Sequence, residues 1–206
     1  MILFVTIAVI AGYFLGNING AVCISRMMGD DVRKHGSGNA GLTNFIRNYG
    51  TGKAALVILI DAGKAVVSCV LGGLLLKGYM GFTAGATVGG LAVMGGHAFP
   101  ALLDFRGGKG ILSGLFIAVV ADWRIAVIIL SVFALMYLIS GYVSLGSVLA
   151  AMTFGVCFVV FHWGDAVTAF CGGTMGCLAT FMHRQNISRL LKGEERKTNL
   201  FKKSAK

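Results

Sequence analysis

The chain has 206 residues, of which 56% are hydrophobic and only 13% are charged. A soluble globular domain carries about 25% charged residues, so the composition excludes an ordinary water-soluble protein. Lysine and arginine outnumber aspartate and glutamate by 18 to 8, which gives a formal net charge of +10. The composition predicts an all-α integral membrane protein, with residues 1–206 forming a single domain that is a polytopic helix bundle.

Apolar runs near the length of a membrane-crossing helix recur along the chain. Hydropathy predicts seven transmembrane helices, roughly over residues 2–22, 54–76, 82–98, 110–121, 125–140, 145–162 and 166–182. The fourth and fifth segments are short for full crossings, so a count of five or six stays open. The first segment has no basic residues before it and no small-residue cleavage site after it. We therefore expect it to be a span and not a signal peptide.

The basic residues are distributed unevenly among the predicted loops, and the positive-inside rule uses this asymmetry to predict orientation. With the N-terminus outside and the C-terminus in the cytoplasm, four segments fall inside: the loops around 23–53, 99–110 and 141–145, and the tail 183–206. These segments hold most of the lysines and arginines, whereas Lys77 and Arg124 fall outside. The basic face would meet anionic lipids and phosphate compounds. Nucleic-acid binding is the poorer explanation, because the cations are divided among membrane loops.

The first polar cluster follows the first predicted span and contains a G-x-G-x-x-G pattern. No strand precedes the pattern, so dinucleotide binding is excluded. Small residues at a helix start favour an anion site, and Ala40, Asn44 and Arg47 would share one helical face, from which Arg47 could clamp the anion. A loop that merely caps a helix through Ser37 or Asn39 is the structural alternative. The residues of interest are Ser37, Gly38, Asn39, Gly41, Thr43, Asn44 and Arg47.

The second polar cluster comprises a Gly-His-x-Phe-Pro segment that includes His97, followed by Lys109 among the glycines Gly107, Gly108 and Gly110. It is not a Walker A loop, because Leu103 stands where the first glycine belongs and no Ser or Thr follows the lysine. A cation on a flexible glycine turn would suit charge on a departing phosphate. The alternative is a juxtamembrane turn whose lysine only reaches toward the interface.

The third polar cluster begins at His183, and His183 and Asn186 would share one face of a short amphipathic helix at the membrane surface. A basic stop-transfer tail would explain residues 192–206 but not this histidine–asparagine pair. Within the second span, Asp61 and Lys64 stand three residues apart and could form either a functional or a structural ion pair.

The chain also lacks several known patterns. No histidine is followed five residues later by aspartate, as in the common glycerolipid acyltransferases, and the paired aspartates of CDP-alcohol phosphotransferases are missing. No residue cluster has the spacing of metal ligands, so we expect no metal and no cofactor. The five cysteines form no CxxC pair, and we expect reduced thiols.

Together, the three clusters resemble the motifs of the bacterial acyl-phosphate:glycerol-3-phosphate acyltransferases, the PlsY family, in the family's order and over essentially the whole chain. The matching motifs are S-G-N-x-G-x-T-N-x-x-R (37–47), G-H-x-F-P with G-G-K-G (96–110) and H-R-x-N-I-x-R-L (183–190). The chain departs from the family at Leu42, Ser188 and Glu194, where alanine, lysine and threonine are common.

The resemblance implies transfer of a fatty acyl group from acyl-phosphate to the 1-hydroxyl of sn-glycerol 3-phosphate, at the cytoplasmic face of a bacterial plasma membrane. The products would be lysophosphatidic acid and phosphate. By position, the resemblance implies four catalytic residues: Ser37, Lys109, His183 and Asn186. It implies these substrate-binding residues: Arg47, Gly38, Asn39, Gly41, Thr43, Asn44, His97, Gly107, Gly108, Ser144 and Arg184.

On this hypothesis Arg47 and Lys109 hold the two phosphates, and Asn186, or Ser37 with loop N–H groups, stabilises the oxyanion. The base stays open among His183, His97 and the substrate's own phosphate. Direct transfer is favoured over an acyl-enzyme at Ser37, which has no evident partnered base. Two other function classes remain, a phosphate or organic-anion transporter and a non-catalytic lipid-binding scaffold. A transporter would be expected to show broken helices and a repeated half.

Overall fold

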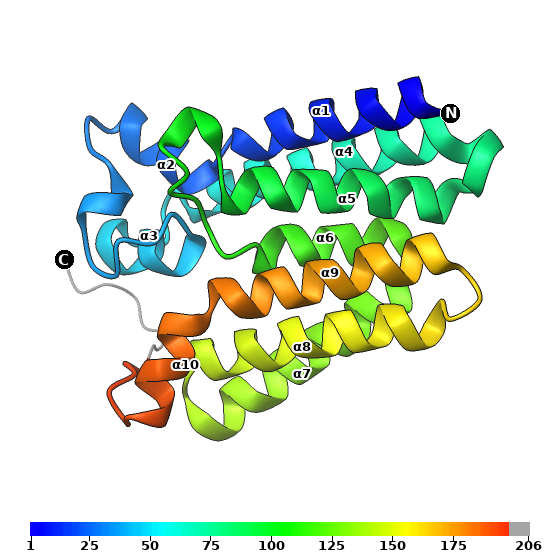
Figure 1. Cartoon of the computed structure of the whole chain (residues 1–206). Helices are drawn as coiled ribbons and strands as arrows, with labels where there is room; N and C mark the ends of the chain where they lie inside the picture. The colour runs from blue at the N-terminus through cyan, green and yellow to red at the C-terminus, as the bar shows by residue number, and fades with distance from the viewer. Residues whose placement is uncertain (198–206) are drawn as a thin grey trace.

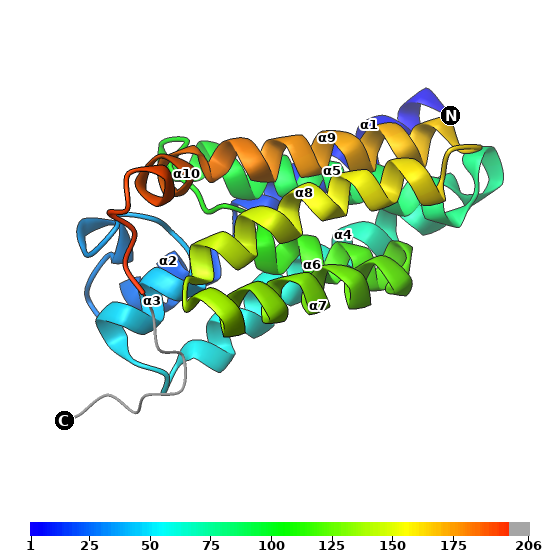
Figure 2. The same cartoon turned by 90° about the horizontal axis from the view of Figure 1, so that it is seen from below.

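The computed structural model describes residues 1–197, and its regular structure over that range is entirely helical. The helices are α1 (Ile2–Asn17), α2 (Gly20–Met27), α3 (Leu42–Tyr49), α4 (Ala54–Met80), α5 (Phe82–Ala98), α6 (Ile111–Ala121), α7 (Trp123–Ser140), α8 (Val143–Phe161), α9 (Ala166–Met182) and α10 (Arg184–Leu191), with 3-10 turns at Val32–Lys34 and Ala101–Leu103. Helix α1 and the helices from α4 to α9 lie side by side along one axis (Figures 1 and 2).

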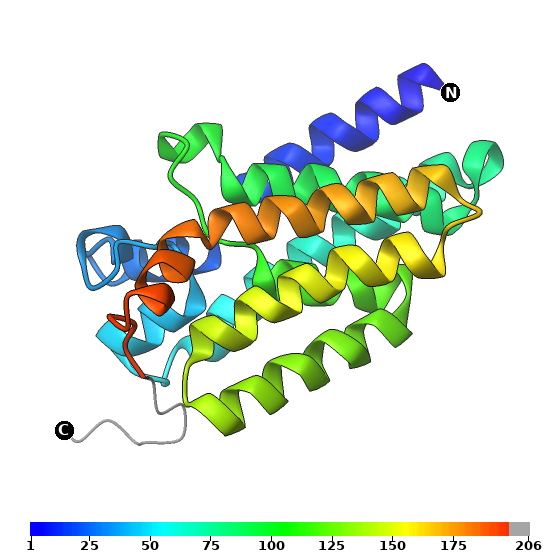
Figure 3. The same ribbon diagram turned by 60° about the horizontal axis from the view of Figure 1, so that its bottom comes forward.

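The short helices α2, α3 and α10 gather at one end of this bundle, opposite the N-terminus (Figures 1 and 3). The loop between α5 and α6 lies at the same end, so the three polar clusters of the sequence share one side of the molecule. We call this end the site end. The opposite end, which we call the far end, carries the turns at residues 80–82, 121–124 and 161–166.

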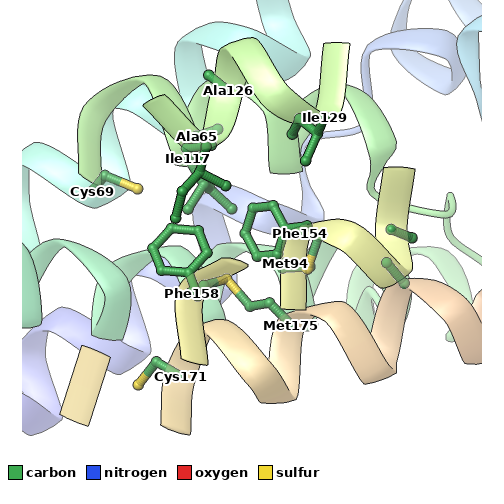
Figure 4. Close-up of a cluster of buried hydrophobic side chains, with 14 of the residues drawn as sticks. Ala65, Cys69, Met94, Ile117, Ala126, Ile129, Phe154, Phe158, Cys171 and Met175 are labelled. Carbon is green, nitrogen blue, oxygen red and sulfur yellow. The ribbon is translucent and has the colours of Figure 1, made fainter. Parts of the chain in front are cut away.

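The helices of the bundle pack closely because glycine and alanine line their contacts. A Cβ atom at Gly96 would overlap the carbonyl oxygen of Tyr13, and one at Gly89 would overlap that of Ser68. Larger side chains fill the centre between α4, α5, α6, α8 and α9. Figure 4 shows Met94, Ile117, Phe154, Phe158 and Met175 in this buried cluster; its other labelled residues include Ala65, Cys69 and Ile129.

A helix occupies each of the seven positions that hydropathy predicted, but the helices differ in length. Four helices between residues 1 and 197 are long and apolar enough to cross a membrane: α4, α5 with the turn that follows it, α7 and α8. The pair α1 and α2 adds a fifth if it counts as one bent span. Helix α6 has 11 residues and extends about 16 Å, roughly half of a ~30 Å hydrocarbon core. The chain is thus a helical membrane protein, and its seven crossings remain a prediction.

The predicted first span over residues 2–22 needs correction, because the helix breaks before Asn19. Helix α1 ends at Asn17, and the Asn19 side chain begins α2 by accepting a hydrogen bond from the Val22 N–H at 3.0 Å. The two axes meet at 41°. The break leaves backbone carbonyls near the site end that accept hydrogen bonds from Lys64, with Nζ 2.7 Å from the Ile18 oxygen. The signal for this break was the Asn-Ile-Asn-Gly segment at residues 17–20, since asparagine favours a helix start, but hydropathy averaged over a whole span does not register it.

Candidate active site

A cavity of about 350 Å³ runs from the site end into the bundle. Its wall has a polar part, formed by the three clusters, and an apolar part, formed by the helices. The polar part includes Ser37, Asn39, Thr43, Asn44, Arg47, His97, Lys109, Ser144, His183, Asn186, Arg189 and Glu195. The apolar part includes Met94, Leu115, Ile129, Leu130, Phe133, Ala151 and Phe154. A smaller cavity of about 230 Å³ adjoins the polar part and is lined by Gly38, Gly107 and Arg184 among others.

The first cluster forms a loop that Asn44 holds in shape. Asn44 is buried, and its amide group donates hydrogen bonds to the carbonyl oxygens of Val32 (3.0 Å) and Asn39 (3.0 Å). Its side-chain oxygen accepts a hydrogen bond from the Ser37 N–H at 3.0 Å. The Asn44 side chain therefore fixes the loop that carries the exposed Ser37 hydroxyl, and the substrate contact that the resemblance implied for Asn44 stays a prediction.

The helix of this cluster starts later than predicted. Helix α3 begins at Leu42 after Gly41, without a side-chain cap, so Ala40 lies outside the helix and the predicted three-residue face is wrong. The alternative, a cap by Ser37 or Asn39, is wrong for the same reason. Arg47 is on the next turn from Thr43 and is exposed where the cavity opens.

The glycine loop of the second cluster is packed and not flexible. A Cβ atom at Gly107 would overlap the carbonyl oxygen of His97, and one at Gly108 would overlap Nε2 of the same residue. The Gly108 N–H also donates to the His97 carbonyl at 3.0 Å. The glycines therefore let the loop lie against His97, which fixes the position of Lys109.

Lys109 joins the second cluster to the third, because its Nζ donates a hydrogen bond to Oδ1 of Asn186. The pKa of Lys109 is lowered to about 8, mainly by burial and also by the nearby charges of Arg189 and Arg47, while Glu195 acts in the opposite direction. The ammonium is therefore held in a site that disfavours its charge. A bound anion would relieve that penalty.

The third cluster forms the predicted amphipathic helix, α10, and turns two polar groups into the cavity. His183 is 3% exposed and Asn186 is 8% exposed. Burial lowers the pKa of His183 to about 4, so its imidazole is neutral near pH 7. Arg184 instead lies outside the main cavity, with its guanidinium carbon 4.4 Å from the centre of the Phe181 ring.

Ser144, at the start of α8, has a buried hydroxyl on the cavity wall that finds no hydrogen-bond partner within residues 1–197. Such groups are rare in folded proteins, because an unsatisfied buried hydroxyl costs about 1–3 kcal/mol. An unpaired hydroxyl facing a cavity indicates a polar ligand atom at that position.

The Asp61–Lys64 ion pair predicted inside the second span forms, with Nζ and Oδ1 2.8 Å apart and side chains only 2% and 4% exposed. Nζ of Lys64 also lies 2.7 Å from Nδ1 of His97. The pair therefore supports a histidine on the cavity wall and is not an isolated charge in the membrane.

Two residues of the polar wall escaped the sequence-based list of site residues. Arg189 and Glu195 form an ion pair at 2.8 Å, and the carboxylate side chain is only 4% exposed. An acidic residue within a strongly basic tail was the available signal for Glu195. The position that departs from the family pattern, Glu194, is exposed. Across residues 1–197 no group of three or more His, Cys, Asp or Glu residues could hold a metal ion.

A basic polar chamber therefore adjoins an apolar channel in one cavity. This arrangement suits an amphiphile with an anionic head, next to a small polar anion. The neutral imidazole, the amide of Asn186 and the unpaired serine hydroxyl supply groups for acyl chemistry on such ligands.

Comparisons with known proteins agree with this chemistry. A family model described as glycerol-3-phosphate acyltransferase matches residues 6–193. The glycerol-3-phosphate acyltransferase of Thermoanaerobacter sp. (strain X514) is 36% identical over 196 residues, which cover 95% of this chain and 96% of that protein. The enzyme of Maricaulis maris (strain MCS10) is 36% identical over 189 residues, covering 91% and 84%.

Solved structures agree as well. The crystal structure of PlsY (YgiH), an integral membrane glycerol 3-phosphate acyltransferase, in its glycerol 3-phosphate form matches with a TM-score of 0.85 and 30% identity, over 96% of this chain and 99% of that one. The lysophosphatidic acid form of PlsY matches with a TM-score of 0.80 and 31% identity, over 95% of each chain. This chain belongs to the glycerol-3-phosphate acyltransferase family.

Proposed function

We propose that this enzyme transfers a fatty acyl group from acyl-phosphate to the 1-hydroxyl of sn-glycerol 3-phosphate, giving lysophosphatidic acid and phosphate. The observation that carries the proposal is the two-part cavity. Its polar part has Arg47, Lys109 and Arg189 for two phosphate groups, and its apolar part suits a fatty chain. Family membership favours this transferase over the anion transporter that the sequence left open.

Within this cavity Lys109 and Asn186 act as a unit. The hydrogen bond between them places an ammonium and an amide side by side, where one group can neutralise the leaving phosphate and the other can donate to the acyl oxyanion. Ser144 adds a hydroxyl that has no partner among the described residues. Arg47, at the opening of the cavity, suits the phosphate of the soluble substrate. The loop held by Asn44 places Ser37 on the wall of the same cavity.

The choice of acyl donor is tested with the purified protein in detergent. Palmitoyl-phosphate and glycerol 3-phosphate should yield phosphate and lysophosphatidic acid, with EDTA present and no added metal. Acyl-CoA should not replace the acyl-phosphate. Efficient turnover with acyl-CoA, or loss of activity on chelation, would contradict the proposal, and the Lys109→Ala variant serves as the inactive control.

For topology, we propose seven crossings in a bacterial plasma membrane, with the N-terminus outside and the site end in the cytoplasm. The concentration of cations at the site end supports this orientation. In a cysteine-free background, cysteines at Lys34 and Lys192 should resist impermeant thiol reagents in intact cells, whereas a cysteine at the far-end Gly164 should react. All three positions are exposed. The opposite labelling pattern would reverse the orientation.

A further inference from the structure

The amine of Lys64 sits among four hydrogen-bonding atoms in the buried part of the site end. Its Nζ lies 2.8 Å from Oδ1 of Asp61, 2.7 Å from the Ile18 carbonyl oxygen, 3.3 Å from the Gly16 carbonyl oxygen and 2.7 Å from Nδ1 of His97. A lysine ammonium has three hydrogens and no lone pair, so it can only donate. Three of the neighbours are oxygens that accept. The fourth is an imidazole nitrogen, which accepts a hydrogen bond if the lysine is charged and can donate one if the lysine is neutral.

The buried carboxylate of Asp61 decides that Lys64 is the charged partner. A carboxylate removed from water requires a cation in direct contact. Asp61 contacts Lys64 at 2.8 Å, whereas Nδ1 of His97 lies 3.9 Å away, beyond hydrogen-bond distance. The charge therefore belongs to Lys64. Nδ1 of His97 then accepts, so the neutral ring carries its proton on Nε2.

The second histidine of the cavity has the reverse arrangement. Nδ1 of His183 lies 2.7 Å from the carbonyl oxygen of Ala179, which can only accept. Nδ1 therefore carries the proton and leaves a lone pair on Nε2. The lowered pKa of His183 agrees with a neutral ring. The two rings line the same cavity and both use Nδ1 for a contact inside the protein, but the proton sits on Nε2 in His97 and on Nδ1 in His183.

We propose that the site holds its two histidines in opposite proton states, His97 as an Nε2–H donor and His183 as an Nε2 acceptor, and that Lys64 is the positioning residue that fixes His97. The catalytic meaning of this inference rests on the proposed acyl transfer. In that reaction His97 would have no free lone pair with which to accept the proton of the glycerol hydroxyl. The acceptor roles then fall to His183 or to the substrate's own phosphate. Nε2 of His97 lies against Gly108, beside Lys109, where an N–H group can support a bound phosphate.

The proton positions can be measured without substrate and without activity. The full chain, labelled with ¹⁵N-histidine and placed in nanodiscs at pH 7, should show His97 protonated on Nε2 and His183 protonated on Nδ1. His35→Gln and His162→Gln remove the signals of the two histidines outside the cavity. The same tautomer in both rings, or a proton on Nδ1 of His97, would overturn the inference. A correct pair of tautomers in a protein without acyl transfer would refute the proposed function alone.

The role of Lys64 is tested with a neutral replacement of the ion pair. Lys64→Met alone leaves Asp61 buried and uncompensated and risks misfolding, so the Asp61→Asn/Lys64→Met double variant is the main test. In the folded double variant the ammonium that donates to Nδ1 is gone, so His97 should show both tautomers. His97→Gln, which keeps a donor near the Nε2 position, should retain at least tenfold more activity than His97→Asn. A double variant with an unchanged His97 tautomer would remove Lys64 from its positioning role. Equal activity of the two His97 variants would remove the donor role of His97 Nε2.

Discussion

The two ends of the bundle use charged residues in different ways. At the far end, Asp122 receives hydrogen bonds from Arg124 at 2.7 Å and from His162 at 3.1 Å, and Asp165 caps α9 by accepting from the Thr168 N–H at 3.1 Å. The Asp122 carboxylate thus joins the start of α7 to the end of α8, and the Asp165 carboxylate stabilises the start of α9. At the site end, Arg47, Lys109 and Arg189 line one cavity, whereas Glu195 is the acidic residue placed among them. Charged residues at the far end are thus paired and hold helix ends together, whereas the cavity at the site end has an excess of positive charge that suits anionic substrates.

The largest expected effect comes from Lys109, where the excess charge is most buried. Lys109→Ala should lower kcat about 100- to 1000-fold, because one preorganised electrostatic contact to the departing phosphate is lost. Lys109→Arg should restore activity only in part, since a planar fork replaces a compact ammonium. Phosphate release at saturating substrates is the measurement. Wild-type kcat in a folded Lys109→Ala protein would mean that the glycine loop is purely structural.

Arg47 should behave differently, because it lies exposed at the opening of the same cavity. A charge-assisted hydrogen bond contributes about 1.5–3 kcal/mol, so Arg47→Ala should raise KM for glycerol 3-phosphate about 10- to 100-fold. The kcat value should change less. Steady-state kinetics with each substrate varied separately test this division. A fall in kcat with an unchanged KM would move Arg47 from binding to the chemical step.

The lowered pKa of Lys109 predicts the pH profile. The active form is the ammonium, which is present below pH 8 and is lost as the pH rises through about 8. We expect kcat/KM, which reports the free enzyme, to fall about tenfold for each pH unit above this value. Bound phosphate stabilises the ammonium, so the break in kcat should lie at higher pH. Identical breaks in both profiles would exclude Lys109 as their source.

The sequence predicted the helices and the shared side of the polar clusters well, because hydropathy and charge asymmetry are local signals. It did not predict contacts that depend on tertiary packing. The fit of Gly107 and Gly108 against His97 could not be predicted, since it is visible only once α5 and the loop meet, and their contact with substrate stays a prediction. The use of Asn44 as a loop support could not be predicted because it requires backbone carbonyls from residues 32–39 to come together, and its contact with substrate stays a prediction. Glu195 was missed because its burial depends on how the tail folds back.

Ser144 allows a finer test, because the chain contains a matched control. Ser144 and Ser113 both have buried hydroxyls without a partner in the described part of the chain, but only Ser144 lines the cavity. A neutral hydrogen bond contributes about 0.5–1.5 kcal/mol, so Ser144→Ala should lower kcat/KM about 2- to 10-fold. Ser113→Ala should leave activity unchanged. Equal effects of the two substitutions would show that the Ser144 hydroxyl meets no substrate atom.

The smallest effect on catalysis is expected at the far end, where Arg124 provides the test of the comparison itself. Its guanidinium lowers the pKa of Asp122 through a hydrogen bond, and its side chain is 57% exposed. An exposed ion pair is screened by water and contributes little to stability, so Arg124→Ala should lower the thermal midpoint slightly and leave kcat and both KM values unchanged. Because the pKa of Asp122 is lowered, the stabilisation is fully present at pH values above the normal pKa of an aspartate. It is lost as the pH falls through the pKa that Asp122 has in the folded protein. The stability difference between Arg124→Ala and wild type should therefore shrink in acid. A loss of activity at neutral pH with an intact fold would show that charge at the far end reaches the site, and the separation between structural and functional charge would fail.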